Sequence, residues 1–520
     1  MQKKRAFISV SDKTGVADFA KGLEDLGYEI ISTGGTLEKL NKSGVSAISV
    51  TKITGFPECL DGRVKTMHPA IHAGILAMRN NEEHMRQIEE LGIAPIDVVA
   101  INLYPFRATI SKPDVKFAEA IENIDIGGPT AIRAAAKNWQ DVYVVCDPAD
   151  YEKVLDELKN ATSADDSLKR RLSAKVFAHT AGYDALISNY LQEQLENGGI
   201  CEKYPETITI TFDKSQDMRY GENPHQSAAF YREPITVEGT LAAAYQHQGK
   251  ELSFNNINDA DAAISLAREF AGDSGIACVV VKHANPCGVA FGGNVFDAYS
   301  KAFEADPVSI FGGIVVVNGE VDEQTAKKMS EIFLEVIIAP SYSKPALKIF
   351  AGKPNLRILE LDVRRGESAA KTDYKRVAGG LLVQDANNLL LRDTKVVTKR
   401  KPTELEMEQL LFAWKVVKYT KSNGIVLAKN NATVGIGPGQ TNRITALELA
   451  IKYAGDKVAG SVMASDAFFP FDDCVKTAAQ AGITAIIQPG GANRDDDSIQ
   501  ACNAADIAMI FTEGVRHFRH

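Results

Sequence analysis

Short apolar runs alternate with amphipathic segments through the first part of the chain. The runs are rich in Val and Ile, as buried strands are, and occupy residues 5–10, 28–32, 96–103 and 142–146. The amphipathic segments have helical spacing and occupy residues 15–26, 37–43, 126–137, 149–158 and 168–195. Short apolar strands that alternate with helices predict a doubly wound α/β fold, with a parallel sheet and helices on both faces.

The chain turns polar at residues 196–206, where two glycines and a proline predict the main linker. We therefore expect one domain over residues 1–198 and a second over residues 199–520. An alternating run at residues 207–212 predicts the strand that opens the second domain.

Two stretches of the second domain follow the same order of strand, polar loop, helix and strand. The first stretch has these elements at residues 277–281, 282–288, 296–305 and 314–317. The second stretch has them at residues 425–428, 429–439, 444–453 and 461–464. The repeated order predicts two related α/β subdomains, with a boundary near residues 386–402 where Asn, Arg and Lys replace apolar residues.

Composition and charge narrow the class of protein. The 520 residues are 45% apolar and 24% charged, which is ordinary for a globular chain, and the length predicts about three to four domain-sized units. The net charge of −9 argues against a general nucleic-acid binder, so anionic ligands need local basic pockets. Seven cysteines without a C-x-x-C pair predict a reducing, cytoplasmic environment. We expect no leader peptide and no membrane helix, because no stretch approaches roughly 20 apolar residues.

Polar, glycine-containing loops follow the first two predicted strands, where ligands of open α/β sheets bind. The first loop is Ser11-Asp12-Lys13-Thr14-Gly15 and the second is Ser32-Thr33-Gly34-Gly35-Thr36. Free amides at a helix start, with hydroxyls beside them, suit a phosphate, although plain helix capping uses the same residue types. Neither loop is a G-x-G-x-x-G or a P-loop pattern, so NAD and ATP lack support.

Three further segments of the first domain carry candidate chemistry. Gly62-Arg63-Val64-Lys65-Thr66 places two cations in a glycine-containing loop, where they neutralise a phosphate or lie on a solvated surface. Asn102-Leu103-Tyr104-Pro105-Phe106 follows the strongest predicted strand. Asp125-Ile126-Gly127-Gly128-Pro129-Thr130 opens a helix that carries Lys137. His68 has a second histidine four residues later but no third ligand, which disfavours a metal.

The segment Lys282-His283-Ala284-Asn285-Pro286-Cys287-Gly288 is the most chemically dense part of the chain. A histidine at a strand end is suited to act as a general base while the adjacent lysine stabilises negative charge, and a hydrogen-bonded structural histidine is the alternative. The segment is faintly similar to zinc deaminases, which use H-x-E and P-C-x-x-C. Asn285 stands in place of the Glu and Ala290 in place of the second Cys, so the zinc ligand set is incomplete.

Together these segments resemble the bifunctional AICAR transformylase and IMP cyclohydrolase family, over essentially the whole chain. The matching segments are residues 11–15, 62–68, 102–106, 125–128, 134–138, 219–226, 282–288 and 465–471. The resemblance implies an amino-terminal methylglyoxal-synthase-like domain with cyclohydrolase activity. It also implies a carboxyl-terminal transformylase of two cytidine-deaminase-like subdomains.

The same resemblance implies the ligands and partners. The formyl donor is 10-formyltetrahydrofolate, and the other small molecules are AICAR, formyl-AICAR and IMP. No metal, nucleic acid or membrane partner is implied. The chain is expected to form a homodimer whose transformylase sites lie between subunits.

For cyclisation, the resemblance implies proton transfer by Lys137 and Asp125, with Tyr104 and Lys65 orienting or polarising the reacting groups. Further residues are implied to hold the phosphate, ribose and base. They are Ser11, Asp12, Lys13, Thr33, Gly34, Gly35, Thr36, Arg63, Val64, Thr66, Ile101, Asn102 and Ile126.

For formyl transfer, the resemblance implies His283 as the base for the AICAR amine. Lys282 stabilises the oxyanion or protonates the departing folate nitrogen. The residues implied at the nucleotide are Arg219, Tyr220, Gly312, Glu335, Asn423, Arg443 and Arg516. The residues implied at the folate are Ile444, Phe468, Asp473, Ala492 and Asn493.

Two other interpretations stay open on the sequence alone. One is a zinc-dependent hydrolase of deaminase type fused to a methylglyoxal-synthase-like phosphate lyase, and the incomplete ligand set disfavours it. The other is a purine-nucleotide sensor that has kept the binding loops. The presence of Lys282, His283, Asp125 and Lys137 disfavours a sensor without activity.

Overall fold

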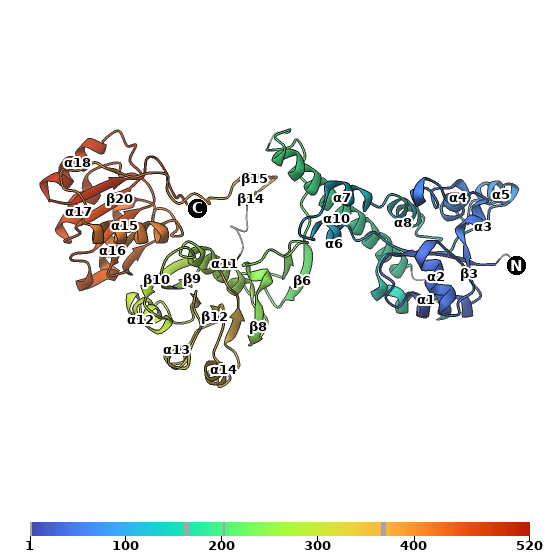
Figure 1. Ribbon diagram of the computed structural model, residues 1–520, viewed down its shortest axis with the longest axis horizontal. Helices are drawn as coiled ribbons and strands as arrows, with labels where there is room; N and C mark the ends of the chain where they lie inside the picture. Colours follow the sequence, from blue (N-terminus) through green and yellow to red (C-terminus); the bar gives the residue numbers. More distant parts are fainter. Residues whose placement is uncertain (1–2, 161–165, 201–202, 366–370) are drawn as a thin grey trace. The chain divides into compact units, whose positions relative to one another are not determined.

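The computed structural model describes residues 3–160, 166–200, 203–365 and 371–520 (Figure 1). Cys201 lies outside the described residues. The chain divides into two compact units, Met1–Asp213 with Glu233–Ile235, and Lys214–Arg232 with Thr236–His520. The length predicted more units, but the two halves of the second unit share one sheet and are counted together.

The first unit is built on a five-stranded parallel sheet. Its strands are β1 (Arg5–Val10), β2 (Glu29–Ser32), β3 (Ala47–Ser49), β4 (Val98–Asn102) and β5 (Tyr143–Val145). Their order is β3-β2-β1-β4-β5, so the direction of winding reverses between β1 and β4. This is the predicted doubly wound sheet, and the reversal marks the edge where such folds bind ligands.

Ten helices connect and cover this sheet in the described part of the first unit. They are α1 (Val16–Asp25), α2 (Gly34–Lys42), α3 (Val50–Thr54), α4 (Pro69–Leu76), α5 (Glu82–Glu90), α6 (Phe106–Ile110), α7 (Phe117–Glu122), α8 (Gly127–Lys137), α9 (Tyr151–Asn160) and α10 (Ser167–Asn197). Buried apolar side chains of the strands form one core with α1, α8 and α10. Burial of such a face is the main force that holds the helices to the sheet.

The second unit contains a twelve-stranded sheet. The first-half strands are β8 (Tyr245–Gln248), β9 (Ile276–Lys282), β10 (Asn285–Gly292), β11 (Ile314–Val317), β12 (Val336–Ala339) and β13 (Arg357–Glu360). The second-half strands are β16 (Lys395–Val396), β17 (Ile425–Lys429), β18 (Ala432–Gly437), β19 (Val462–Ser465), β20 (Ala485–Gln488) and β21 (Ala508–Phe511). Two separate hairpins pair β6 (Asp213–Met218) with β7 (Ala228–Arg232), and β14 (Thr372–Val377) with β15 (Gly380–Asp385).

The two halves of this sheet repeat the same topology. From the middle outward, one half runs β10-β9-β11-β12-β13-β8 and the other β18-β17-β19-β20-β21-β16. In each half the third, fourth and fifth strands are parallel to one another and the sixth is antiparallel. The halves meet where β10 pairs antiparallel with β18 at Ala290 and Ala432. This arrangement relates them by an approximate twofold rotation and fits the two related subdomains that the sequence predicted.

The helices of the second unit follow the same repeat. They are α11 (Phe254–Arg268), α12 (Val295–Ala305), α13 (Glu323–Met329) and α14 (Lys344–Phe350), then α15 (Glu404–Val417), α16 (Arg443–Ala454), α17 (Asp473–Gln480) and α18 (Asp495–Ala504). One core spans both halves under α11 and α15. Two further cores lie on the other face, one with α12 to α14 and one with α16 to α18.

Three sequence predictions about the residues that follow the predicted linker were wrong in part, and the first of these segments, residues 207–212, belongs to the first unit. Residues 207–212 form no strand, because their alternating apolar side chains find no neighbouring strand, and Ile208, Ile210 and Phe212 are exposed. Most of the expected loop 282–288 belongs to the β9–β10 hairpin, and much of 429–439 belongs to the β17–β18 hairpin. In both segments the polar turn residues interrupt the run of apolar residues. The strand residues next to the turns were therefore assigned to a polar loop.

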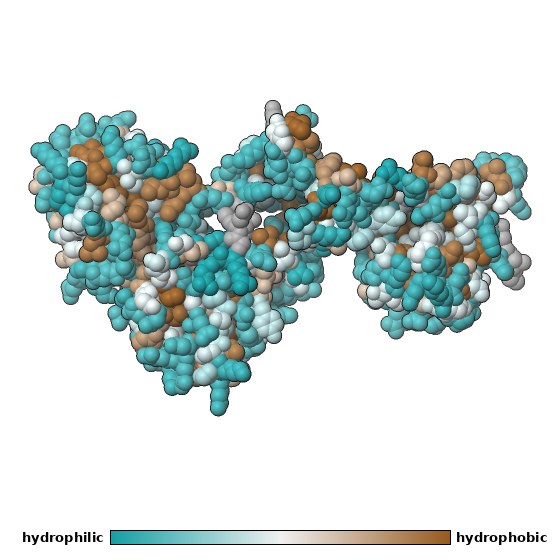
Figure 2. Space-filling model, viewed as in Figure 1, coloured by the Kyte–Doolittle hydropathy of each residue, from teal (hydrophilic) through white to brown (hydrophobic). Residues whose placement is uncertain are grey.

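The surface has no continuous apolar band in the view of Figure 2, where apolar side chains gather in separate patches. None of the described helices has the length and apolar character to cross a membrane. All six described cysteines are free thiols.

Candidate active sites

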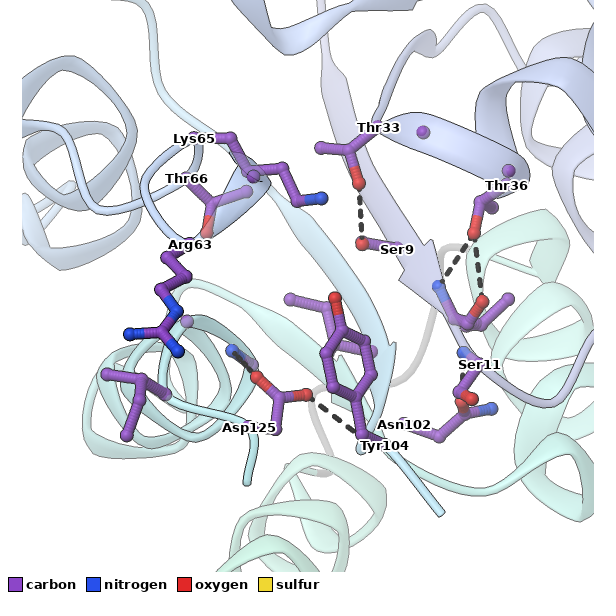
Figure 3. Close-up of a pocket in the computed structure, with 18 of the residues that line it drawn as sticks. Ser9, Ser11, Thr33, Thr36, Arg63, Lys65, Thr66, Asn102, Tyr104 and Asp125 are labelled. Atoms are coloured by element: carbon purple, nitrogen blue, oxygen red, sulfur yellow. Dashed lines mark hydrogen bonds between the residues drawn. The ribbon is translucent and has the colours of Figure 1, made fainter. Parts of the chain in front are cut away.

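A pocket of about 550 Å³ opens at the carboxyl ends of β1, β2 and β4 in the first unit (Figure 3). This is the edge where the winding of the sheet reverses, and the sequence predicted ligand-binding loops there. The predicted residues that line the pocket are Ser11, Lys13, Thr33, Gly34, Gly35, Thr36, Arg63, Lys65, Thr66, Ile101, Asn102, Tyr104, Asp125 and Ile126. Asp12, Val64 and Lys137 are not among its lining residues.

The loop after β2 forms one wall of the pocket and leads into α2. Thr36 ties this helix to β1, since its hydroxyl accepts from the N–H of Val10 at 3.1 Å and donates to the carbonyl at 2.9 Å. Thr33 contacts Ser9 through their hydroxyls at 2.9 Å. The ammonium end of Lys13 lies over Gly35. Free amides at the start of α2, next to a cation, make this wall suited to a phosphate.

Asn102 connects the ends of β1 and β4. Its Oδ1 accepts from the N–H groups of Ser11 at 2.6 Å and Asp12 at 2.9 Å, and its Nδ2 donates to the Asp12 carbonyl at 2.9 Å. The Asp12 carboxylate accepts from Thr14 at the start of the next helix. In this state both residues shape the loop rather than face the pocket with free groups.

Two backbone hydrogen bonds hold the Asp125 side chain just before the start of α8. Its Oδ1 accepts from the N–H of Gly128 at 2.8 Å and its Oδ2 from the N–H of Tyr104 at 3.3 Å. Burial raises the pKa of this carboxyl above its ordinary value, despite both hydrogen bonds. Lys65, on the facing wall in Figure 3, lies 3.6 Å from Glu58. A carboxyl with a raised pKa that faces a cation across the pocket is suited to proton transfer.

Two predicted cations of this site are placed differently from the rest. Arg63 lines the pocket but forms an ion pair with Glu122 of α7. Lys137 ends α8 on its exposed side, nine residues beyond Gly128, or about 14 Å along the helix. The structure therefore does not bring Lys137 to Asp125.

Strand directions place the predicted transformylase residues, apart from Arg219 and Tyr220, at one edge of the twelve-stranded sheet. The carboxyl end of β9 and the starts of β11, β12 and β13 lie at this edge, with Lys282, Gly312 and Glu335. The start of β17 and the carboxyl ends of β19, β20 and β21 reach the same edge from the other half. Asn423, Phe468, Asn493 and the other second-half residues follow or precede those strands.

In the first half, Lys282 is the last residue of β9, and His283 and Ala284 form the turn of the β9–β10 hairpin. Lys282 Nζ donates to the carbonyl of Phe311 at 2.8 Å, next to Gly312. Gly312 has a φ of 72°, a conformation that favours glycine. The His283 side chain is not among the buried groups, so its imidazole is accessible.

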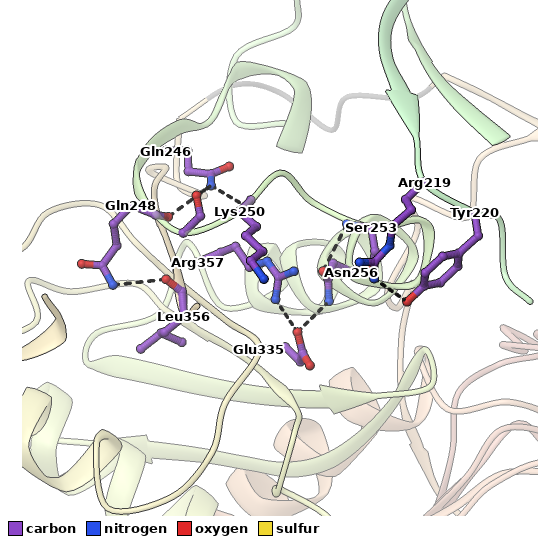
Figure 4. A network of polar contacts seen from close by, with 11 residues as sticks. Arg219, Tyr220, Gln246, Gln248, Lys250, Ser253, Asn256, Glu335, Leu356 and Arg357 are labelled. Carbon is purple, nitrogen blue, oxygen red and sulfur yellow. Dashed lines mark hydrogen bonds and ion pairs between the residues drawn. The ribbon is translucent and has the colours of Figure 1, made fainter. Parts of the chain in front are cut away.

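A polar network continues this site along the edge (Figure 4). Glu335 pairs with Arg357 at 2.5 Å and accepts weakly from Asn256 at 3.5 Å. Arg219 and Tyr220 lie near the start of α11 in the same view, with the guanidinium 4.9 Å from the ring centre. Glu335 is thus already paired with a cation, which the sequence did not indicate.

In the second half, Arg443 is the centre of the predicted site. It is 8% exposed, and its guanidinium donates to Asn423 Oδ1 at 2.7 Å, to the Phe468 carbonyl at 3.1 Å and to the buried Asp466. Arg443 therefore holds other site residues in place. Arg516 stacks over the Phe468 ring at 4.8 Å and presents a more accessible cation.

The remaining predicted folate-side residues lie in loops or at helix starts on this edge. They are Ile444 on the first turn of α16, Asp473 on the first turn of α17, and Ala492 and Asn493 before α18. From β9 to β19 the sheet order has four steps, or about 19 Å at the usual strand spacing. Within one chain, His283 is therefore well separated from the loops that follow β19, β20 and β21.

No group of three or more His, Cys, Asp or Glu side chains in the described residues is arranged to hold a metal ion. His68, one of the two histidines considered above, instead accepts from the N–H of Ala70 and caps α4.

Comparisons with known proteins cover both units. A family model described as "AICARFT/IMPCHase bienzyme" matches residues 135–453, and one described as "MGS-like domain" matches residues 15–130. The "Bifunctional purine biosynthesis protein PurH" of Acetivibrio thermocellus is 58% identical over 520 residues, 99% of this chain and 100% of that protein. This chain belongs to the AICARFT/IMPCHase bienzyme family.

A protein of the same name from Bacillus cereus is 57% identical over 520 residues, 100% of this chain and of that protein. The solved structure titled "Crystal structure of ForH" is 34% identical, covers 36% of this chain and 95% of that chain, and has a TM-score of 0.33. The bienzyme family and the MGS-like domain confirm the resemblance and the fold class that the sequence indicated.

Several residues of this bienzyme's sites escaped the sequence analysis. Ser9 lines the first pocket, and its polar side chain inside an apolar strand was a usable signal. Glu122 and Tyr183 belong to helices far along the chain and to no motif, so only the fold reveals their contacts with Arg63 and Asp125.

Proposed function

We propose that this chain catalyses the last two steps of IMP synthesis: formyl transfer from 10-formyltetrahydrofolate to AICAR, and closure of formyl-AICAR to IMP. The observation that carries the proposal is a pair of separate polar sites, one in each unit, in a chain closely similar to proteins named as bifunctional. One site combines a phosphate-binding wall with a buried carboxyl, and the other combines a histidine with a lysine.

In cyclisation, the carboxamide nitrogen of formyl-AICAR attacks the formyl carbon and water leaves. A phosphate at the start of α2 directs the rest of the nucleotide across the pocket toward Asp125 and Tyr104. The reacting groups belong to one molecule, so fixing their orientation lowers much of the barrier. Asp125 transfers a proton between the attacking nitrogen and the departing oxygen, while Lys65 polarises the formyl oxygen. Lys137 stays a predicted proton-transfer residue, and an unchanged rate of cyclisation in Lys137→Ala would contradict that role.

In formyl transfer, the amine of AICAR attacks the formyl carbon of the folate. This amine is conjugated with the ring and is a poor nucleophile, so it needs a base as the bond forms. His283 takes the proton, and Lys282 stabilises the oxyanion or protonates the departing folate nitrogen. Arg219 and Arg516 hold the nucleotide, and Phe468 packs against the folate.

The proposal includes a cytoplasmic homodimer that acts on small molecules only. The separation of about 19 Å between β9 and β19 supports a site completed by a second copy, because a folate loop must reach the base. The six cysteines within the described part of the chain are free thiols, which fits a reducing compartment.

The decisive experiment supplies purified protein with AICAR and 10-formyltetrahydrofolate and follows products by mass spectrometry. We expect IMP and tetrahydrofolate. Formyl-AICAR without IMP would contradict the role of the first unit. Binding of AICAR without any turnover would contradict both activities and favour a nucleotide sensor.

A further inference from the structure

Asp259, on α11, holds the hairpin turn that carries His283. Its Oδ2 accepts from the N–H of His283 at 3.0 Å, and its Oδ1 accepts from the N–H of Ala284 at 2.7 Å. Both carboxylate oxygens are thus used on two consecutive amides. Charge-assisted hydrogen bonds of this kind are stronger than neutral ones.

The second half of the sheet has a matching turn without this charge. Gln409 follows its capping residue Thr403 by six positions, as Asp259 follows Ser253. Gln409 Oε1 accepts from the N–H of Asn431 at 2.7 Å, and its amide donates to the Asn431 side chain. A neutral side chain is therefore sufficient to hold this turn in the fold.

The two turns differ in how easily their residues adopt the required backbone. His283 and Ala284 have φ of 53° and 57°, and the matching Asn430 and Asn431 have 55° and 57°. Asn enters this left-handed region readily, whereas Ala does so at a cost. The first turn thus needs an outside partner more than the second, and a carboxylate supplies it.

We propose that Asp259 is a positioning residue for formyl transfer, which fixes the His283 backbone so that its imidazole meets the reacting amine. This inference rests on the proposed role of His283. The α11 helix is anchored at its start by the Ser253 and Asn256 capping box and packs under the sheet, so Asp259 works from a rigid support. Misplacing a base by about 1 Å costs on the order of 100-fold in rate.

The test compares Asp259→Ala, Asp259→Asn and the matched control Gln409→Ala in the full chain. Formyl transfer is measured with AICAR and 10-formyltetrahydrofolate, and cyclisation is measured separately with supplied formyl-AICAR. Thermal unfolding of each variant measures the purely structural effect. His283→Ala is assayed beside them, so that loss of the proposed base is seen independently.

We expect kcat for formyl transfer to fall about 100-fold in Asp259→Ala and about tenfold in Asp259→Asn, which keeps one acceptor oxygen. The KM for AICAR and the rate of cyclisation stay within about twofold of wild type. Gln409→Ala lowers the unfolding temperature but leaves formyl transfer within about twofold.

Two results would overturn the inference. One is formyl transfer by Asp259→Ala at the wild-type rate while His283→Ala is inactive. The other is an equal loss of formyl transfer in Gln409→Ala, which would make the effect one of general stability. An active His283→Ala variant would instead overturn the proposed base.

Discussion

The phenol oxygen of Tyr183 accepts a hydrogen bond from the backbone N–H of Asp125 at 2.9 Å. Tyr183 lies on α10, and its ring packs edge-on against Phe106 of α6. Burial raises the pKa of this phenol to about 12, so it stays protonated and also donates to the Asn123 carbonyl at 3.3 Å. Through Tyr183, the long helix α10 therefore fixes the backbone of Asp125, the candidate proton-transfer residue of the first pocket.

We expect Tyr183→Phe to lower kcat for cyclisation about tenfold, because it leaves the amide of Asp125 without its acceptor. Tyr190→Phe is the matched control, since Tyr190 lies on the same helix and packs against Phe106 as well. Formyl transfer in the same protein is the internal standard. Equal losses in the two variants would assign the effect to helix packing.

Asp125→Asn removes the proposed proton-transfer group and is expected to lower cyclisation by about 100-fold or more. In the wild type, the carboxylate is lost as the pH falls through a pKa raised above 3.8, so cyclisation declines at a higher pH than for an ordinary aspartate. A pH profile of kcat measures this decline. A profile that is the same in Asp125→Asn would contradict the assignment.

His283→Ala is expected to abolish formyl transfer and to leave cyclisation of supplied formyl-AICAR unchanged, because the two groups lie in different units. Asn430→Ala changes the matching residue of the other hairpin and is the control. Loss of both activities in a folded His283→Ala protein would show that the units do not divide the chemistry as proposed.

His517 provides a pH-dependent contribution to stability. The side chain is fully buried against Trp414, and burial, with Lys418 nearby, lowers its pKa from 6.5 to about 4. Between pH 6.5 and about 4, His517 is protonated in the unfolded chain but neutral in the folded chain. The free energy of unfolding therefore falls as the pH drops through this range. The loss approaches about 3 kcal/mol.

Urea unfolding followed by Trp414 fluorescence in a Trp139→Phe background measures this effect, since the chain has two tryptophans. His517→Gln keeps a donor for the Leu390 carbonyl, which His517 contacts at 3.1 Å, but cannot titrate. Its stability is expected to change less between these pH values. An equal pH dependence in the two proteins would place the effect elsewhere.

Gly437 of β18 allows α16 to pack closely on the sheet, because an added Cβ would overlap the carbonyl of Ala446. Gly437→Ala is expected to destabilise the second unit by about 2–3 kcal/mol. Gly272→Ala is the control, as nothing lies within 4 Å of its Cβ position. Urea unfolding distinguishes them, and equal midpoints would mean that α16 shifts freely.

The sequence indicated most of the first unit because its signals are local. Strands, helices and the loops after β1 and β2 each occupy one continuous segment, so hydrophobic period and glycine spacing suffice. The partners of those loops could not be predicted this way. Asn102 contacts Ser11, and Tyr183 contacts Asp125, across distances in sequence that only the fold closes.

The second unit shows the same limit more strongly. The repeated order of elements was visible in the sequence, but pairing of β10 with β18 was not. Arg443 was predicted to bind substrate, and nothing nearby in sequence revealed that the buried Asp466 already pairs with it. Likewise, residues 207–212 have the period of a strand, yet strand formation depends on a neighbour that the structure does not supply.

The rotation that relates the two halves of the twelve-stranded sheet places a second, equivalent turn at the opposite edge of that sheet, which we call the opposite rim. There the turn of Lys429, Asn430 and Asn431 lies at the same edge of the sheet as the carboxyl ends of β11, β12 and β13, just as His283 lies at the same edge as the carboxyl ends of β19, β20 and β21. Lys429 still donates to a carbonyl, that of Ala459, as Lys282 does to Phe311. The opposite rim has the same backbone turn as the candidate site but carries Asn430 where the candidate site carries His283. We therefore expect substitutions on this rim to leave both reactions intact.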